Sequence, residues 1–150
     1  MEYKHWTDRL KKLNACPEAV VWAKRYATFE DAWVECDRGD WMLWLAARVF
    51  YDRKASVLCA CACARLALCY VPNGEERPRK AIEAAEAWVR GEVTLKDVHE
   101  AYADADAAAF AAHAAAIAAA DARAKTLHLC ADLARQHIDE KKIASALQTI

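Results

Sequence analysis

No stretch of this chain alternates apolar and polar residues in the way that a half-buried β-strand requires. Only three glycines and three prolines interrupt the 150 residues, so helical periodicity extends over long segments. We therefore expect an all-α protein. The predicted architecture is a single domain over residues 1–150, a helical bundle of roughly six to eight helices with an alanine-rich central helix.

Capping residues predict where the first helices begin. Pro17 suits the first position of a helix because its missing N–H is not required there, and this helix should run through roughly Tyr26. Thr28 followed by Asp31 approximates a capping box. The segment FEDAWVECD after Thr28 is therefore predicted to be the next helix.

The tripeptide Arg38-Gly39-Asp40 falls between two predicted helices. Gly39 is expected to end the first helix, and Asp40 is expected to cap the second, WMLWLAARVF. Because these residues have structural roles at a tight helical corner, we do not interpret the tripeptide as a cell-adhesion signal.

Three further helical segments are predicted after Ser56. A cysteine-rich helix should follow Ser56 and run to about Val71, and the next should begin at Pro78 and close at Gly91. Thr94 with Asp97 forms another near capping box, which starts a helical pattern that extends to about Ile138. Residues 139–150 are predicted to be a short helix or a loosely attached tail.

Sixteen of the 24 residues from Ala101 to Ala124 are alanine. A single helix from Thr94 to Ile138 would be longer than a compact domain of this size is wide, so a break is expected, with Asp121 as the preferred position. The larger side chains share one helical stripe, which favours a bundle helix over a disordered segment. These are Leu95, His99, Tyr102, Asp106, Phe110, His113 and Ile117.

His99, Asp106 and His113 recur every seven residues on that stripe. Seven helical residues separate side chains by about 10.5 Å, whereas a zinc ion holds its ligands within about 2.3 Å. Core polar residues with hydrogen-bond partners are therefore favoured over a metal site. No catalytic or phosphate-binding motif is present, so we expect no catalytic residues, no metal and no cofactor.

The segment VLCACACARLALC concentrates cysteines on one predicted helix. Cys59 and Cys63 share a face, while Cys61 lies on the opposite side of the axis, so the three thiolates cannot close on one metal. Helical i, i+4 spacing also leaves Cys59 and Cys63 too far apart for a ready disulfide. Packing as small apolar residues is the preferred interpretation, with a shared site involving Cys130 or His128 as the alternative.

Charge and targeting patterns exclude several classes of partner. Lysine plus arginine number 21 against 22 acidic residues, so no global basic field favours nucleic acid or an anionic membrane. The charged N-terminus lacks the apolar region of a signal peptide, and the seven cysteines fit reduced thiols. We expect a cytoplasmic protein that binds neither nucleic acid nor membranes.

Two groups of residues are candidates for contact with a protein partner. Trp41, Trp44 and Arg48 share one helix face, and both residue types are enriched at interface hot spots, although core packing is the favoured explanation for the tryptophans because indoles bury a large apolar area. Asp97, Glu100 and Asp104 share the face opposite the large-residue stripe. The preferred interpretation is an ordinary solvated face, in which acids near a helix N-terminus interact favourably with the helix dipole, and the alternative is a patch for a basic partner.

Four segments together resemble the immunity protein family of bacterial toxin systems, in a branch also found in phages and prophages. They are AWVECDRGDWMLWLAARV, PNGEERPRKAIEAAEAWVRGE, AAAFAAHAAAIAAADARA and CADLARQHI. The resemblance extends over roughly residues 10–138. It implies a non-enzymatic protein that acts by binding another protein, and it transfers no functional residue.

We therefore expect a non-enzymatic inhibitor that neutralises a protein partner, such as a toxin, by direct binding. One alternative is a phage-encoded inhibitor of a host defence complex, an anti-CRISPR or a similar anti-defence protein. Another is a small-ligand or metal-binding helical protein with a pocket formed by His99, Asp106, His113 and the cysteines. The identity of the partner and a homodimeric state are left open.

Overall fold

The computed structural model describes residues 4–49, 52–101 and 120–150. Every regular element within these ranges is a helix, which confirms the predicted all-α class. None of the helices in the described ranges is both long and apolar enough to cross a membrane.

The N-terminal third of the chain folds into four short helices joined by tight turns. Thr28 accepts a hydrogen bond from the Asp31 backbone N–H at 3.1 Å, so the predicted cap is confirmed. The helices are α1 (Thr7–Lys12), α2 (Pro17–Ala23), α3 (Phe29–Glu35) and α4 (Gly39–Arg48).

The rest of the chain supplies longer helices. These are α5 (Arg53–Ala67) with a 3₁₀ turn at Leu68–Tyr70, α6 (Arg77–Val89), α8 (Ala120–His137) and α9 (Glu140–Gln148). Residues 95–101 are also helical, and the Thr94 backbone N–H donates to Asp97 Oδ2 at 2.8 Å, which confirms the second predicted cap. Gly91 closes α6 as expected, with a positive φ of 76°.

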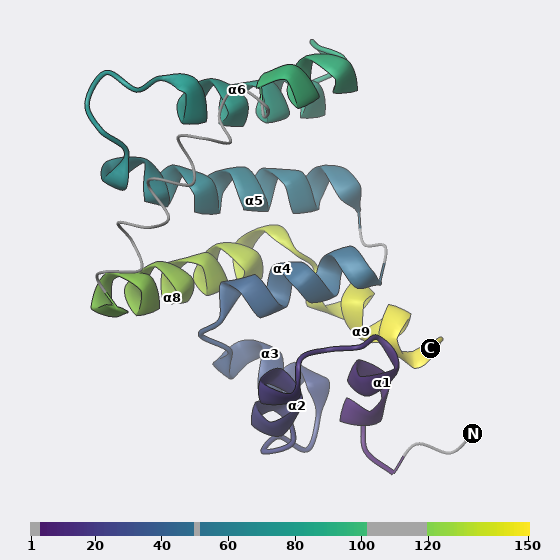
Figure 1. Ribbon diagram of the computed structural model, residues 1–150. Helices are drawn as coiled ribbons and strands as arrows, with labels where there is room; N and C mark the ends of the chain where they lie inside the picture. Colours follow the sequence, from purple (N-terminus) through teal and green to yellow (C-terminus); the bar gives the residue numbers. More distant parts are fainter. Residues whose placement is uncertain (1–3, 50–51, 102–119) are drawn as a thin grey trace.

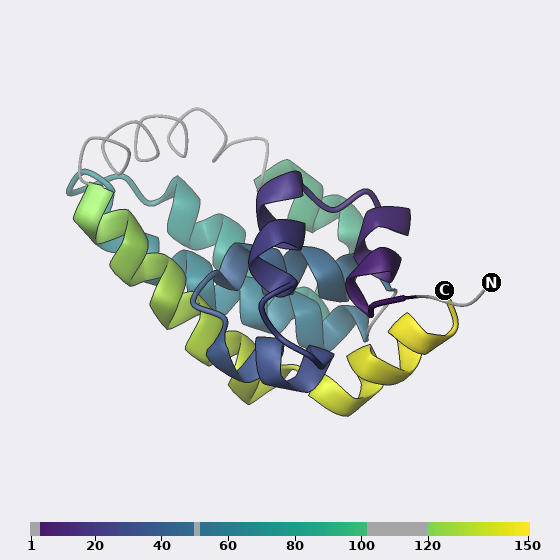
Figure 2. The same cartoon turned by 90° about the horizontal axis from the view of Figure 1, so that it is seen from below.

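The helices form stacked layers (Figure 1). Helix α5 lies between α6 on one side and the pair α4 and α8 on the other, and it contacts all three. Helices α1, α2 and α3 lie beyond α4. Seen from below, α9 continues from α8 toward α1 (Figure 2), where Lys12 Nζ donates to the Ile150 carbonyl at 3.0 Å.

The main core lies between these layers. Ala46 of α4, Cys59 of α5 and Ala131 of α8 are each 0% exposed, so small side chains allow the three helices to approach closely. The C-terminal segment forms helix α9, in which Ile143 is also fully buried. Helix α9 packs against α3.

Several predicted boundaries were wrong. Helix α3 ends at Glu35, and Gly39 is the first residue of α4, so Gly39 does not end the preceding helix. Asp40 lies in the first turn of α4 and does not cap it. Asp52 caps α5 by accepting from the Lys54 and Ala55 backbone N–H groups, so the cysteine helix begins before Ser56.

The first helix was not predicted at all, and the second is shorter than predicted. Helix α1 buries Leu10, and Asn14, which follows the C-cap residue Leu13, has a positive φ of 62°. Charged residues around Leu10 masked a recurrence of apolar residues at Trp6, Leu10 and Leu13 that fits a helical face. Helix α2 stops at Ala23, and the chain turns before Tyr26.

The predictions for the centre of the alanine-rich segment lie outside the described residues. This applies to the predicted stripe residues from Tyr102 to Ile117 and to Asp104 on the acidic face. The expected break at Asp121 concerns the junction with that same undescribed segment.

Candidate functional site

Helix α4 presents the predicted tryptophan face. Met42, Leu45 and Ala46 are buried, whereas Trp41 and Trp44 are half-buried. Both tryptophans therefore keep part of their surface accessible on this helix. The next predicted member of this face, Arg48, is exposed, and its guanidinium carbon lies 5.7 Å from the Trp44 ring centroid.

The two tryptophans line a cavity of about 480 Å³ between α4 and the three preceding helices. Five of the six tryptophans in the chain contribute to its wall. The lining consists of Trp6, Leu10, Ala15, Cys16, Glu18, Ala19, Trp22, Ala23, Phe29, Ala32, Trp33, Cys36, Arg38, Asp40, Trp41, Met42, Trp44 and Leu45.

Aromatic contacts hold the wall of this cavity, which we call the tryptophan cavity. The Trp22 and Trp41 rings meet edge to face with centroids 5.9 Å apart, and Phe29 lies 5.6 Å from Trp33. Trp6 Nε1 donates to the Tyr26 carbonyl at 3.0 Å. Edge-to-face geometry is favourable for aromatic pairs, and the Trp6 hydrogen bond orients its ring, so the wall is held in a defined arrangement.

Charged residues lie at the mouth of the cavity. Arg38 donates through Nε and Nη2 to the Asp40 carboxylate at 2.9 and 2.7 Å, and its Nη1 lies 3.7 Å from Glu18 Oε1. The Arg38 guanidinium carbon also lies 4.2 Å from the Trp41 ring centroid. Burial acts to raise the pKa of Asp40, but the Arg38 hydrogen bonds outweigh it and lower that pKa below its ordinary value.

Arg135 of α8 supports the back of the cavity. Its Nη1 donates to the carbonyls of Trp33 and Cys36 at 3.1 and 2.7 Å, and its Nη2 donates to Asp132 at 2.8 Å. These bonds satisfy carbonyls at the C-terminal end of α3, where a positive charge is also favourable to the helix dipole. Arg135 thus joins the aromatic wall to the central layer.

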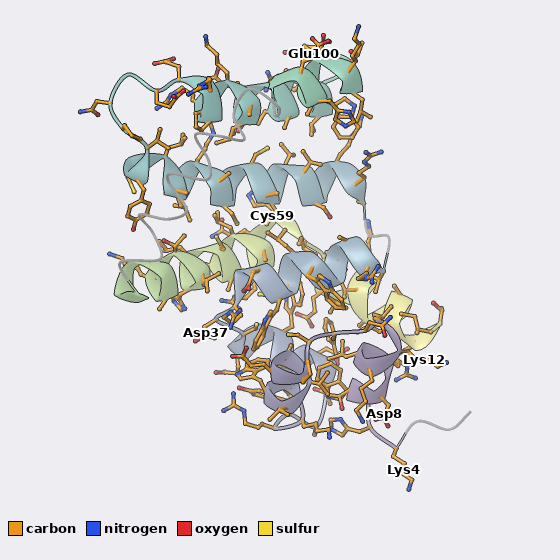
Figure 3. The ribbon with its side chains drawn as sticks, viewed as in Figure 1. Lys4, Asp8, Lys12, Asp37, Cys59 and Glu100 are labelled. Carbon is orange, nitrogen blue, oxygen red and sulfur yellow. The ribbon has the colours of Figure 1, made fainter. Side chains whose placement is uncertain are left out.

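The cysteines of α5 divide between two neighbouring helices. Cys61 Sγ points to the Ile82 carbonyl of α6 at 3.9 Å, whereas Cys63 Sγ points to the Cys130 carbonyl of α8 at 4.0 Å. Cys59 is fully buried, and Figure 3 places it between α5 and the layer of α4 and α8. The predicted opposite orientation of Cys61 is therefore observed.

Cys59, Cys63 and Cys130 form a hydrogen-bonded group of thiols. The bond with Cys130 favours a lower pKa for Cys63, but the bond with Cys59 and burial outweigh it and raise the pKa to about 12. The bond with Cys63 and burial also raise the pKa of Cys130. Two members of the group therefore remain protonated near neutral pH and behave as packing residues.

Of the histidines of the predicted pocket, the structure describes only His99, and it does not bring His99 to the cysteines. His99 is exposed on the helical segment 95–101, while Asp106 and His113 lie outside the described residues. In the three described ranges, no group of three or more histidine, cysteine or acidic side chains has an arrangement that could hold a metal ion.

The predicted acidic face lies far from the tryptophan face. Asp97 and Glu100 are exposed on the segment 95–101, and Glu100 Oε1 lies 3.8 Å from Lys96 Nζ. Figure 3 shows Glu100 at the outer edge of the α6 layer, with α5 between that layer and α4. Asp97 and Glu100 therefore do not form one continuous patch with the tryptophan face.

Sequence reasoning identified Trp41 and Trp44 but missed the rest of the tryptophan cavity. Trp6 immediately precedes α1, Trp22 lies on α2 and Trp33 lies on α3, and only the tertiary fold brings them together. The sequence feature that could have indicated the cavity is the large number of aromatic residues before Trp44. These residues are more than helices of six or seven residues need for their own packing.

These observations describe an all-α protein with an open, aromatic-lined cavity next to α4. The family model described as Imm-5 like putative immunity protein matches residues 52–131, which is more than half of the chain. The chain belongs to this family, as the resemblance in its sequence predicted. The match covers α5, α6 and the first part of α8, and the tryptophan cavity lies before it. No curated protein and no solved structure matches the chain.

Proposed function

We propose that this protein is a non-enzymatic inhibitor that neutralises a protein toxin by binding it directly. Membership of an immunity protein family supports an immunity role. The observation that carries the binding proposal is the half-buried pair Trp41 and Trp44 at an open cavity. Tryptophans that a folded chain leaves partly exposed around a recess are typical anchors of protein interfaces.

The proposed binding surface is the α4 face with Trp41, Trp44 and Arg48. Tryptophan and arginine contribute large contact areas, and the Arg48 guanidinium near the Trp44 ring limits the motion of both side chains. A surface that is already ordered loses less conformational entropy on binding than a flexible one. This pairing supports Trp44 as an energetic centre of the interface.

The test begins with identification of the toxin. The tagged protein is used to capture partners from its native host, mass spectrometry identifies them, and each candidate is expressed in a bacterial strain with and without this protein. Rescue of growth, together with a direct complex between the two purified proteins, is the expected result. A candidate toxin that kills equally in both strains and forms no complex contradicts the proposal for that pair.

A matched pair of variants then tests the surface. Trp44→Ala should weaken toxin binding by more than about 2 kcal/mol, or roughly 30-fold, while circular dichroism shows intact helix. Trp88→Ala is the control, because Trp88 is also half-buried and has the Arg53 guanidinium carbon 5.2 Å from its ring centroid, but lies on α6. If Trp44→Ala and Trp88→Ala bind the toxin with equal affinity, the role of Trp44 is packing alone.

A further inference from the structure

We propose that the tryptophan cavity accepts one large apolar side chain of the toxin, and that a lysine or arginine beside that side chain pairs with Glu18. This inference rests on the proposed inhibitory function and specifies what the binding surface recognises. It assigns a role to the α2 side of the cavity, which the α4 face alone does not include.

The size of the cavity is the first argument. Protein interiors are close-packed, and voids much larger than a water molecule are few. A space of about 480 Å³ lies within the range of sites that receive ligands or anchoring groups. Because its lining includes the exposed residues Cys16, Glu18 and Asp40, the space reaches the surface and is accessible to a partner.

The lining selects an apolar occupant. The buried part of the wall includes Leu10, Phe29, Trp33 and Leu45, and the charged lining residues are confined to the mouth. A polar side chain inserted here would lose its hydrogen bonds to water without replacing them at the wall. An aromatic or large aliphatic side chain would instead bury apolar surface against the indoles.

The arginines of the chain argue against a cationic occupant within the cavity. Arg38 already lies over the Trp41 ring, and the Arg25 guanidinium carbon lies 5.4 Å from the Trp22 centroid. A second cation over either ring would be repelled by these guanidinium groups. The recess therefore differs from an aromatic cage whose ring faces are free to bind an ammonium group.

The exposed Glu18 carboxylate at the opening of the tryptophan cavity can pair with a lysine or arginine of the toxin that remains outside the cavity. Asp40 is engaged by two short hydrogen bonds from Arg38, whereas Glu18 lies 3.7 Å from Arg38 Nη1 and exposes 76% of its side chain. A lysine or arginine of the toxin can therefore reach the Glu18 carboxylate without first displacing the Asp40 pair. Such a contact at an interface rim acts mainly on the association rate.

A variant that fills the cavity tests the apolar anchor without removing any core side chain. Ala19 is half-buried and lines the cavity, so Ala19→Phe should occupy the space that the toxin side chain requires. We expect toxin affinity to fall at least tenfold while the melting temperature stays the same or rises. Ala60→Phe, at an exposed position of α5, is the control and should retain affinity.

The charge at the mouth is tested separately by Glu18→Lys, which leaves the apolar wall intact and does not depend on the folding of Ala19→Phe. We expect association with the toxin to slow at least threefold, and Glu30→Lys, at an exposed acid of α3 that does not line the cavity, should not slow it. If Ala19→Phe and Glu18→Lys both bind the toxin as the wild type does, the inference about the cavity is wrong. The proposed inhibitory function of the wild-type protein is not affected by that result.

Two other outcomes are informative. A small apolar molecule that co-purifies with the wild type and is lost in Ala19→Phe, with toxin affinity unchanged, also overturns the inference by assigning the cavity to a ligand. Failure of the wild-type protein to bind any toxin contradicts the proposed function itself, and this result is distinct from the behaviour of the variants.

Discussion

Gly39 of α4 lies directly against Cys130 of α8. A Cβ atom built on Gly39 would contact the Cys130 Cβ and come within 2.6 Å of the Ala131 backbone nitrogen. Glycine is therefore required here by the close approach of two helices. Gly39 is also the first residue of α4, and Trp41, two residues later, lines the tryptophan cavity.

Gly39→Ala is expected to destabilise the protein by about 1 to 3 kcal/mol, because the added methyl group forces α4 and α8 apart. Helix propensity alone predicts the opposite sign, since alanine is favoured over glycine by up to about 1 kcal/mol in a helix interior. Urea denaturation of both proteins measures the difference. Increased stability of Gly39→Ala would contradict the close packing of these helices.

The reactivity of the cysteines should follow their burial. Cys16 and Cys69 are exposed, so a thiol reagent at neutral pH should modify these two of the seven cysteines rapidly. Cys59, Cys61 and Cys63 should react only after denaturation, because Cys59 and Cys61 are buried and Cys63 has a pKa of about 12. Mass spectrometry of modified peptides measures each rate. Rapid labelling of Cys63 in the native protein would contradict this order.

The ion pair between Arg65 and Glu86 predicts a pH dependence of stability. Arg65 donates to both Glu86 oxygens at 2.8 and 2.7 Å, which lowers the pKa of Glu86 below the ordinary value of 4.5. The stabilisation is thus present above about pH 4.5 and is lost as the pH falls through the lowered value. Because both side chains are partly exposed, solvent screening limits the contribution to at most about 1 kcal/mol.

Glu86→Gln should therefore lower the free energy of unfolding at pH 7 by that amount and have a smaller effect at pH 3. Chemical denaturation at the two pH values measures both differences. Glu83→Gln, at an exposed position of the same helix, is the control. A Glu86→Gln effect that does not diminish on acidification would mean that the ion pair does not carry the stabilisation.

The acidic face of Asp97 and Glu100 gives a kinetic prediction. If this face meets basic groups of the toxin, Glu100→Lys should reduce the association rate more than it raises the dissociation rate. The association rate of the wild type should also fall as salt rises, because screening acts over about 8 Å at physiological ionic strength. Surface plasmon resonance across a salt series measures both rates.

Glu100→Gln removes one charge where Glu100→Lys changes two, so it should slow association to an intermediate extent. A wild-type association rate that is independent of salt, with both variants unchanged, would assign the acidic face to ordinary solvated surface. That result would leave the binding proposal for Trp41 and Trp44 unaffected, since the two surfaces lie on opposite sides of α5 (Figure 3).

The sequence by itself determined the features that depend on neighbouring residues. The caps at Thr28 and Thr94, the closure of α6 by Gly91 and the all-helical class follow from hydrogen bonds and φ preferences within one turn of helix. The opposite directions of Cys61 and Cys63 also follow from helical geometry alone. The immunity protein family was likewise recognisable from the order of the segments.

Only the tertiary structure decided the features that depend on contacts between distant residues. Gly39 looked like a helix end because glycine has that local preference, but the approach of Cys130 and Ala131 determines its role. The tryptophan cavity has the same origin, since Trp6 and Trp44 come to line one cavity through the packing of separate helices. Helical periodicity predicts which face is apolar, but it does not predict how completely the opposing helices fill the space between them.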